Sequence, residues 1–170
     1  FGIDTLLSPE TALEIYEQCN QMLQEDGFTA RGMMRKFKIE VVCTTDDPCD
    51  SLIYHKQIKD SGFEIKVLPT WRPDKSLAVE NSANFVNYIQ KLTNVSGISI
   101  HNFHDYLNAI KNRHDYFNSM GCKLSDHGIE TFYSESCTDD EAEAIFKKVY
   151  VEKKDLTATE ISKFKSNMLY

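Results

Sequence analysis

Residues 39–48 read IEVVCTTDDP, and this stretch decides the predicted fold. A short β-branched run, typical of a strand, stops in a cluster of hydroxyls, carboxylates and a proline. Two later stretches have the same form, IKVLPTWRPD at residues 65–74 and GCKLSDHG at residues 121–128. In α/β proteins, groups at the carboxyl ends of strands lie where ligands bind. We therefore expect three polar residues on a common rim, Asp46, Arg72 and His127.

The segments between these strands predict helices. Asp50 can cap a helix that runs to about residue 60, with Gly62 behind it, so the first two strands form a βαβ unit with parallel strands. Two further helices are expected over 83–92 and 103–120 before the third strand. The second of them has one apolar stripe, and its members are Phe103, Leu107, Ile110, His114 and Phe117.

Helix signals also occur near both ends of the chain. Ser8, Pro9 and Glu10 predict a helix start, and the helix that follows has one apolar face made of Ala12, Leu13, Tyr16, Cys19, Met22 and Leu23. A shorter segment over 30–36 leads into the first strand. Capping boxes at 138–141 (TDDE) and 157–160 (TATE) open two more helices.

These elements predict an α/β protein whose strands belong to an open doubly wound sheet or to a (β/α)8 barrel. The chain starts at Phe1 without an initiator methionine and stops inside a helical pattern, so we expect it to be cut from a longer protein. That expectation favours a partial (β/α)8 barrel, an arc of about three parallel strands with flanking and inserted helices. Residues 1–36 are expected to form a helical segment, and residues 37–170 to form β/α units truncated at both ends.

Composition limits the function classes. A formal net charge of -7 argues against a nucleic-acid partner, which requires a basic face. No apolar run approaches the roughly 20 residues that span a bilayer, so we expect no membrane contact. The five cysteines form no CxxC pair, and Cys43 and Cys122 lie within predicted strands as small apolar residues. These features indicate a reduced, cytosolic protein.

The acidic cluster after the first strand has two interpretations. Asp46 and Asp47 resemble a metal-binding or general-base cluster. Alternatively, Thr44 and Asp46 bind backbone amides of the loop, and Asp47 begins the next helix. Asp46 stays a candidate catalytic residue on this evidence.

The WRPD motif is more informative, because Arg72 directly follows a predicted buried strand. Arginine presents a planar fork that suits a carboxylate or phosphate. Trp71 beside it offers an apolar wall and one N–H donor. We favour substrate binding by Arg72 over the alternative, a surface pair with Asp74 that supports a turn.

The SDHG motif places a second candidate catalytic residue, His127, on the same rim. Adjacent residues cannot form a Ser-His-Asp triad, because those side chains must face one another. His127 could instead form functional hydrogen bonds or face a metal, or it could be a satisfied loop histidine. His55 is expected to be exposed. No glycine-rich phosphate loop is present.

Taken in order, VCTTDDPCDSL at residues 42–52, LPTWRPDK at 68–75 and GCKLSDHG at 121–128 resemble the uronate (glucuronate) isomerase family. The resemblance extends over nearly the whole chain. It implies a distorted (β/α)8 barrel of the amidohydrolase superfamily in the cytosol. It also implies interconversion of D-glucuronate with D-fructuronate and of D-galacturonate with D-tagaturonate.

The resemblance further implies roles for residues and cofactors. Arg72 corresponds to the arginine that contacts the bound uronate, whereas no specific family role is carried over to Asp46 or His127. A divalent metal, often zinc, and a homo-oligomer are expected for the whole protein. The family's His-x-His pair is missing from this sequence, so this segment is expected to supply no metal ligand and to be inactive alone. Residues 1–36 would then be the end of a helical insertion.

Two other function classes stay open at this point. A metal-dependent hydrolase of the same barrel superfamily would need a metal site built outside this segment. A non-enzymic binding domain of flavodoxin-like architecture would need to fold as a stable monomer with all strand edges protected.

Overall fold

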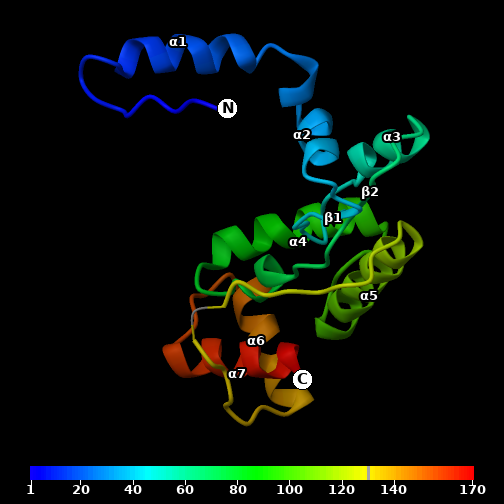
Figure 1. Cartoon of the computed structure of the whole chain (residues 1–170). Helices are drawn as coiled ribbons and strands as arrows, with labels where there is room; N and C mark the ends of the chain where they lie inside the picture. The colour runs from blue at the N-terminus through cyan, green and yellow to red at the C-terminus, as the bar shows by residue number, and fades with distance from the viewer. Residues whose placement is uncertain (130) are drawn as a thin grey trace. The chain divides into compact units, whose positions relative to one another are not determined.

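The computed structural model describes residues 1–129 and 131–170. It divides into two compact units, an N-terminal unit of residues 1–42 and 64–66 and a larger unit of residues 43–63 and 67–170. The elements follow one another as shown in Figure 1: α1 (Ala12–Met22), η1 (Asp26–Phe28), α2 (Ala30–Lys36), β1 (Val41–Cys43), α3 (Ile53–Asp60), β2 (Lys66–Leu68), η2 (Asp74–Leu77), α4 (Ser82–Ser96), α5 (Phe103–Ser119), α6 (Asp139–Phe146), η3 (Lys147–Val151) and α7 (Ala158–Leu169).

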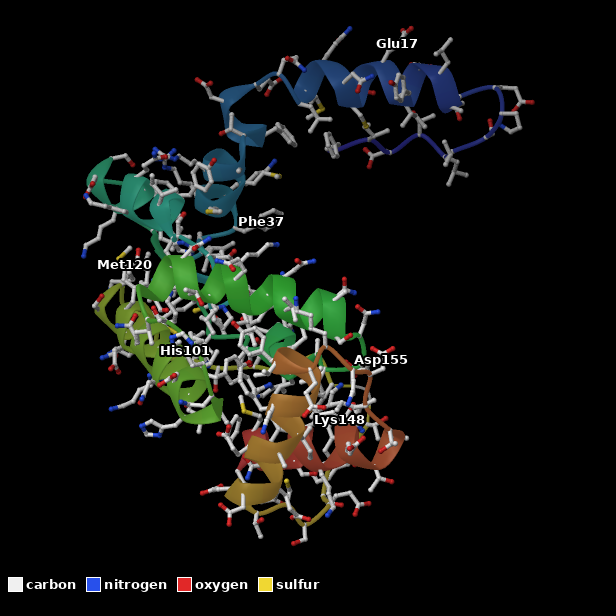
Figure 2. The ribbon with its side chains drawn as sticks, turned by 180° about the vertical axis from the view of Figure 1, so that it is seen from behind. Glu17, Phe37, His101, Met120, Lys148 and Asp155 are labelled. Atoms are coloured by element: carbon white, nitrogen blue, oxygen red, sulfur yellow. The ribbon has the colours of Figure 1, made fainter. Side chains whose placement is uncertain are left out.

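The N-terminal unit consists of short helices with exposed apolar side chains. Its first turn begins at Ser8, whose hydroxyl accepts a hydrogen bond from the Thr11 amide at 3.3 Å, while α1 itself starts one turn later. No residue of α1 is buried, and Tyr16 is 64% exposed. Figure 2 draws the side chains of this unit as sticks and labels Glu17 of α1 and Phe37, which directly follows α2. The predicted apolar face of α1 therefore exists but is not covered within this unit.

The strands are shorter than the sequence patterns suggested. β1 and β2 form a two-stranded sheet, and their carboxyl ends continue the pairing beyond the strands through a parallel bridge between Asp46 and Trp71. The βαβ prediction is confirmed, with α3 between the two strands. Cys43 is exposed, so the prediction that it packs as a small apolar residue is wrong, whereas Cys122 is buried.

The third predicted strand is reduced to a single contact among the described residues. Trp71 forms an isolated parallel bridge with Ser125, in which the Trp71 amide donates to Leu124 O at 3.0 Å and the Asp126 amide donates to Trp71 O at 3.1 Å. One bridge is too little for a strand, so the described residues form a parallel sheet of two strands, and the arc of three strands stays a prediction. The direction of the predicted pairing is nevertheless correct.

An aromatic core holds the larger unit together. Phe85 of α4 meets rings of three other helices edge to face, at centroid distances of 5.8 Å to Tyr106, 6.0 Å to Phe146 and 6.1 Å to Phe164. α4 lies beside α5, and α6 packs against α7, as Figure 1 also shows. Offset and edge-to-face contacts of this kind add to the hydrophobic stabilisation of a core.

The inward face of α5 differs from the predicted stripe. Its buried residues are Phe103, Tyr106, Ala109, Arg113 and Phe117, whereas Leu107 and His114 are exposed. Arg113 replaces His114 because its guanidinium satisfies three backbone carbonyls. It donates to Pro48 O at 2.8 Å, to Asp50 O at 2.9 Å and to Val95 O at 3.3 Å.

Helix caps were predicted with mixed success. Both capping boxes are present, with Thr138 and Thr157 as the N-caps of α6 and α7. The N-cap of α3 is Leu52 in the left-handed conformation, so the prediction that Asp50 caps this helix is wrong. The Asp50 carboxylate instead accepts from the Asp47 amide at 2.8 Å and shapes the preceding loop.

Within the part of the chain that the structure describes, no helix combines the length and the apolar character needed to cross a membrane.

Candidate functional site

The ends of β1 and β2 and the segment at Ser125 bring the predicted rim residues into one network. Thr44 N donates to Leu68 O at 3.0 Å, Asp46 N to Thr70 O at 3.2 Å, and Arg72 N to Asp46 O at 3.0 Å. This ladder fixes the backbone on both sides of the WRPD motif. All residues of the network belong to the larger unit.

Arg72 is bound by a carboxylate from the SDHG segment. Its Nε donates to Asp126 Oδ1 at 3.1 Å and its Nη2 donates to Asp126 Oδ2 at 2.7 Å, a two-point pairing. Asp74 Oδ2 lies 3.8 Å from Arg72 Nε. The hydrogen bonds to Asp126 raise the pKa of Arg72, so its guanidinium stays charged. The sequence-based alternative, an Arg72–Asp74 pair, is thus a minor contact compared with the Arg72–Asp126 pair.

Asp74 connects the same two loops, but here the carboxylate belongs to the WRPD loop and its partners belong to the SDHG segment. Its carboxylate accepts from the Gly128 amide at 2.7 Å and lies 2.9 Å from His127 Nδ1. A carboxylate at this distance favours a proton on Nδ1, so the contact orients the imidazole ring. His127 is therefore an oriented histidine of the rim. Its catalytic role stays a prediction.

A small cavity lies beside this contact between the loops. Its volume is about 290 Å³, and it is lined on one side by Asp74 and Gly128 and on the other by Tyr133 and Lys165. Burial alone would lower the pKa of Lys165, but the hydrogen bonds with Glu80 and Tyr133 outweigh it and raise that pKa. The cavity wall thus carries both an acid and a charged amine.

Trp71 faces the core more than the rim. The residue is 8% exposed, and its ring meets Phe117 edge to face at a centroid distance of 5.0 Å and His114 at 5.4 Å. It also lines a cavity of about 270 Å³ together with Asn118 and Ser125. Arg72 does not line that cavity. A substrate contact by Trp71 stays a prediction, while its packing role is established.

Asp46 is the centre of a buried polar group that includes an unpredicted histidine. Thr44 Oγ1 donates to Asp46 Oδ2 at 2.6 Å, and the Thr70 amide donates to the same oxygen at 3.3 Å. Since the Thr44 proton goes to the carboxylate, His55 Nε2, 2.7 Å away, donates to Thr44 Oγ1. Both of these hydrogen bonds fall on Oδ2 of Asp46, and the bond from the Thr70 amide is of the kind that the alternative interpretation expected.

The prediction that His55 is exposed is wrong, because only 11% of its side chain is accessible. Its Nδ1 is buried and has no hydrogen-bond partner within residues 1–129 and 131–170. Sequence reasoning missed it because α3 shows Ile53 and Tyr54 to solvent, so apolar spacing does not identify the inward face. No other sequence signal marked this residue.

Asp47 has the surroundings of a loop-forming residue. Its Oδ1 accepts from the Cys49 amide at 2.9 Å, and its pKa is raised, mainly by burial. The like charge of Asp50 adds a smaller increase, while Lys75 at 3.8 Å acts in the opposite direction. The side-by-side carboxylates of the sequence therefore do not form a shared acidic centre.

The chain offers no metal centre within its described residues. No group of three or more His, Cys, Asp or Glu side chains in residues 1–129 and 131–170 could hold a metal ion. The metal-cluster interpretation of the TTDDP stretch therefore finds no geometric support, and we assign no chemical step to a metal here.

A comparison with sequence families decides the identity of the chain. The sequence model of the glucuronate isomerase family matches residues 1–170. The chain belongs to this family. The resemblance proposed from the three strand-end motifs is therefore confirmed.

Individual relatives within the glucuronate isomerase family agree with that assignment. The chain is 60% identical to the uronate isomerase of Bacteroides thetaiotaomicron over 169 residues, which make up 99% of this chain and 36% of that protein. Crystal structures of uronate isomerase from Thermotoga maritima and of glucuronate isomerase from Caulobacter crescentus each match with a TM-score of 0.90. The Thermotoga maritima structure is 32% identical, and the match covers 98% of this chain and 36% of that chain. The Caulobacter crescentus structure is 30% identical, and the match covers 99% of this chain and 35% of that chain. The chain thus spans about a third of the length of the relatives it matches.

Proposed function

We propose that the whole protein to which this chain belongs is an aldose–ketose isomerase of uronate sugar acids. It would interconvert D-glucuronate with D-fructuronate and D-galacturonate with D-tagaturonate. The observation that carries the proposal is the family match along all 170 residues. The matched relatives are named as isomerases, so the hydrolase and the flavodoxin-like alternatives are not favoured.

In this proposal Arg72 contacts the uronate. The reaction moves a proton between adjacent carbons and needs donors for the developing oxyanion as well as a cation that recognises an acidic sugar. Arg72 supports this role because it lies in the loop after β2, is charged and keeps 37% of its side chain exposed. Trp71 would form an apolar wall beside it. Asp46 and His127 are the candidates for catalytic contacts.

The remaining machinery would lie outside this segment. The divalent metal, with zinc as the candidate, would be held by residues of the whole protein that this chain lacks, so the segment alone would be inactive. Residues 1–36 would form the end of a helical insertion and residues 37–170 part of the arc of a (β/α)8 barrel. A homo-oligomer in the cytosol, with no nucleic-acid or membrane partner, completes the proposal.

The test replaces Arg72 in the full-length enzyme. Because a hydrogen-bonded charge at a substrate stabilises binding by roughly 1.5–3 kcal/mol, Arg72→Ala should lower kcat/KM for D-glucuronate and D-galacturonate by about 10–100-fold. Arg35→Ala is the matched control, since Arg35 also pairs with a carboxylate at two points, through Nε and Nη2 to Glu64. Equal activity of both variants and the unaltered enzyme would contradict the assigned role of Arg72.

A further inference from the structure

The guanidinium of Arg72 is held along one edge only. Nε and Nη2 both donate to Asp126, so these two bonds fix the plane as well as the position of the group. Nη1 has no hydrogen bond to any described residue. Three donors are left over, the two hydrogens of Nη1 and the second hydrogen of Nη2. One hydrogen on each of these nitrogens forms the other two-point edge of the guanidinium.

Asp126 is itself anchored next to the residue that it holds. Its amide donates to Trp71 O at 3.1 Å, so its backbone is attached to the residue just before Arg72. The side chain then closes the contact onto Arg72. Because the backbone of Asp126 is bonded to the residue before Arg72, its carboxylate starts from a fixed position close to the guanidinium.

Asp74 and Gly128 close the same two loops from the other side. A Cβ placed on Gly128 would lie 3.2 Å from Asp74 Oδ2 and 3.8 Å from Arg72 Nη1. The 3.2 Å distance is tighter than ordinary contact, so a larger residue at position 128 would require the Asp74 carboxylate to shift by a few tenths of an ångström. The SDHG segment therefore contacts the WRPD loop at two places, through Asp126 on Arg72 and through the Gly128 amide on Asp74.

We propose that Asp126 is the positioning residue for Arg72 and that the Nη1–Nη2 edge is the one presented to the uronate. This inference rests on the proposed function of Arg72. Asp126 acts through the arginine and does not contact the substrate. By holding the guanidinium in place before the substrate arrives, it removes the need to order a flexible side chain during binding.

A pair that only stabilises the surface would have the same geometry but would respond differently to substitution. Arg72 and Asp126 are 37% and 43% exposed, and ion pairs at that exposure contribute little to folding stability. Loss of Asp126 should therefore change substrate binding far more than thermal stability. Glu64 provides the matched control, because it forms a pair of the same two-point geometry with Arg35.

The experiment uses the full-length enzyme with Asp126→Asn, Asp126→Glu, Glu64→Gln and Arg72→Ala, assayed with D-glucuronate. Asp126→Asn keeps one acceptor but loses the charge and the second bond. The KM of this variant should rise about 10-fold or more, as for the loss of residues that orient a ligand. Its kcat should fall less, and its Tm should stay close to that of the unaltered enzyme. Asp126→Glu should recover part of the loss, and Glu64→Gln should leave KM and kcat unchanged.

The outcomes separate the two proposals. If Arg72→Ala raises KM but Asp126→Asn does not, the positioning role is overturned while the role of Arg72 stands. If Asp126→Asn lowers activity only together with Tm, the residue is structural and the inference is also overturned. If Arg72→Ala has no effect, the proposed function of Arg72 fails first.

Discussion

Two helices of this chain have similar apolar patterns but different surroundings. In the N-terminal unit, α1 carries its apolar residues at helical spacing and buries none of them. In the larger unit, α4 does the same and buries Phe85, Tyr88, Ile89 and Leu92. The comparison teaches that spacing predicts a helix and its apolar face, whereas the free energy gained depends on what covers that face.

The largest expected effect comes from truncating the centre of the covered face. Phe85 is 1% exposed, so Phe85→Ala should lower the free energy of unfolding by about 3–5 kcal/mol through lost contacts and a cavity. Tyr16→Ala in α1 should change it by less than about 0.5 kcal/mol. Urea unfolding of the two variants measures both. A similar cost for Tyr16 would mean that α1 has a partner in solution.

Arg113 allows a second test, because it is the buried charge of the larger unit that satisfies backbone groups. Arg113→Met leaves the carbonyls of Pro48, Asp50 and Val95 without this donor, and we expect a loss of about 2–4 kcal/mol. Arg35→Ala in the N-terminal unit removes an exposed pair and should lower the stability much less, because solvent screens such pairs. Thermal unfolding of the two variants compares these losses of stability. Equal losses would contradict the expectation that the buried arginine contributes more than the exposed one.

A smaller difference is expected at the helix caps. Thr157→Ala removes the side-chain acceptor for the Glu160 amide at the start of α7, and should cost about 1 kcal/mol. Thr29→Ala removes the corresponding acceptor for Gly32 in α2, and we expect less in this short helix with no buried residue. Chemical denaturation of both variants measures the loss of unfolding free energy. A larger loss for Thr29→Ala than for Thr157→Ala would contradict this expectation.

The smallest effect concerns pH. The hydrogen bond from Lys148 and that from the Thr157 amide lower the pKa of Glu160 to about 2, from an ordinary value of 4.5. The ionised carboxylate therefore adds stability that is complete above pH 4.5 and is lost as pH falls toward 2. Glu160→Gln should flatten this part of the Tm profile between pH 5 and 2. An unchanged slope would show that Glu160 does not contribute to acid sensitivity.

The sequence predicted those features that depend on local chemistry. The capping boxes at Thr138 and Thr157 were found because each follows from residues within a turn. Arg72 was selected because it follows a predicted buried strand, and its role in substrate binding stays a prediction. The family resemblance added the substrate class, which no local pattern could supply.

The errors arose where distant segments decide the outcome. Arg113 is buried because carbonyls of the β1–α3 loop and of α4 receive its donors, which apolar spacing along α5 does not reveal. The side chain of His55 is largely covered because it meets Thr44 and Asp46 across a loop. Asp126 was overlooked beside His127, because its importance depends on a pairing with a residue 54 positions earlier.

A double-mutant cycle on the full-length enzyme tests the central claim, that Asp126 acts through Arg72. The measurement is kcat/KM for D-glucuronate in the unaltered enzyme, in Arg72→Ala, in Asp126→Asn and in the double variant. We predict that Asp126→Asn lowers kcat/KM about 10-fold or more when Arg72 is present and has almost no further effect when Arg72→Ala is also present. The same fold loss in both backgrounds would contradict the account.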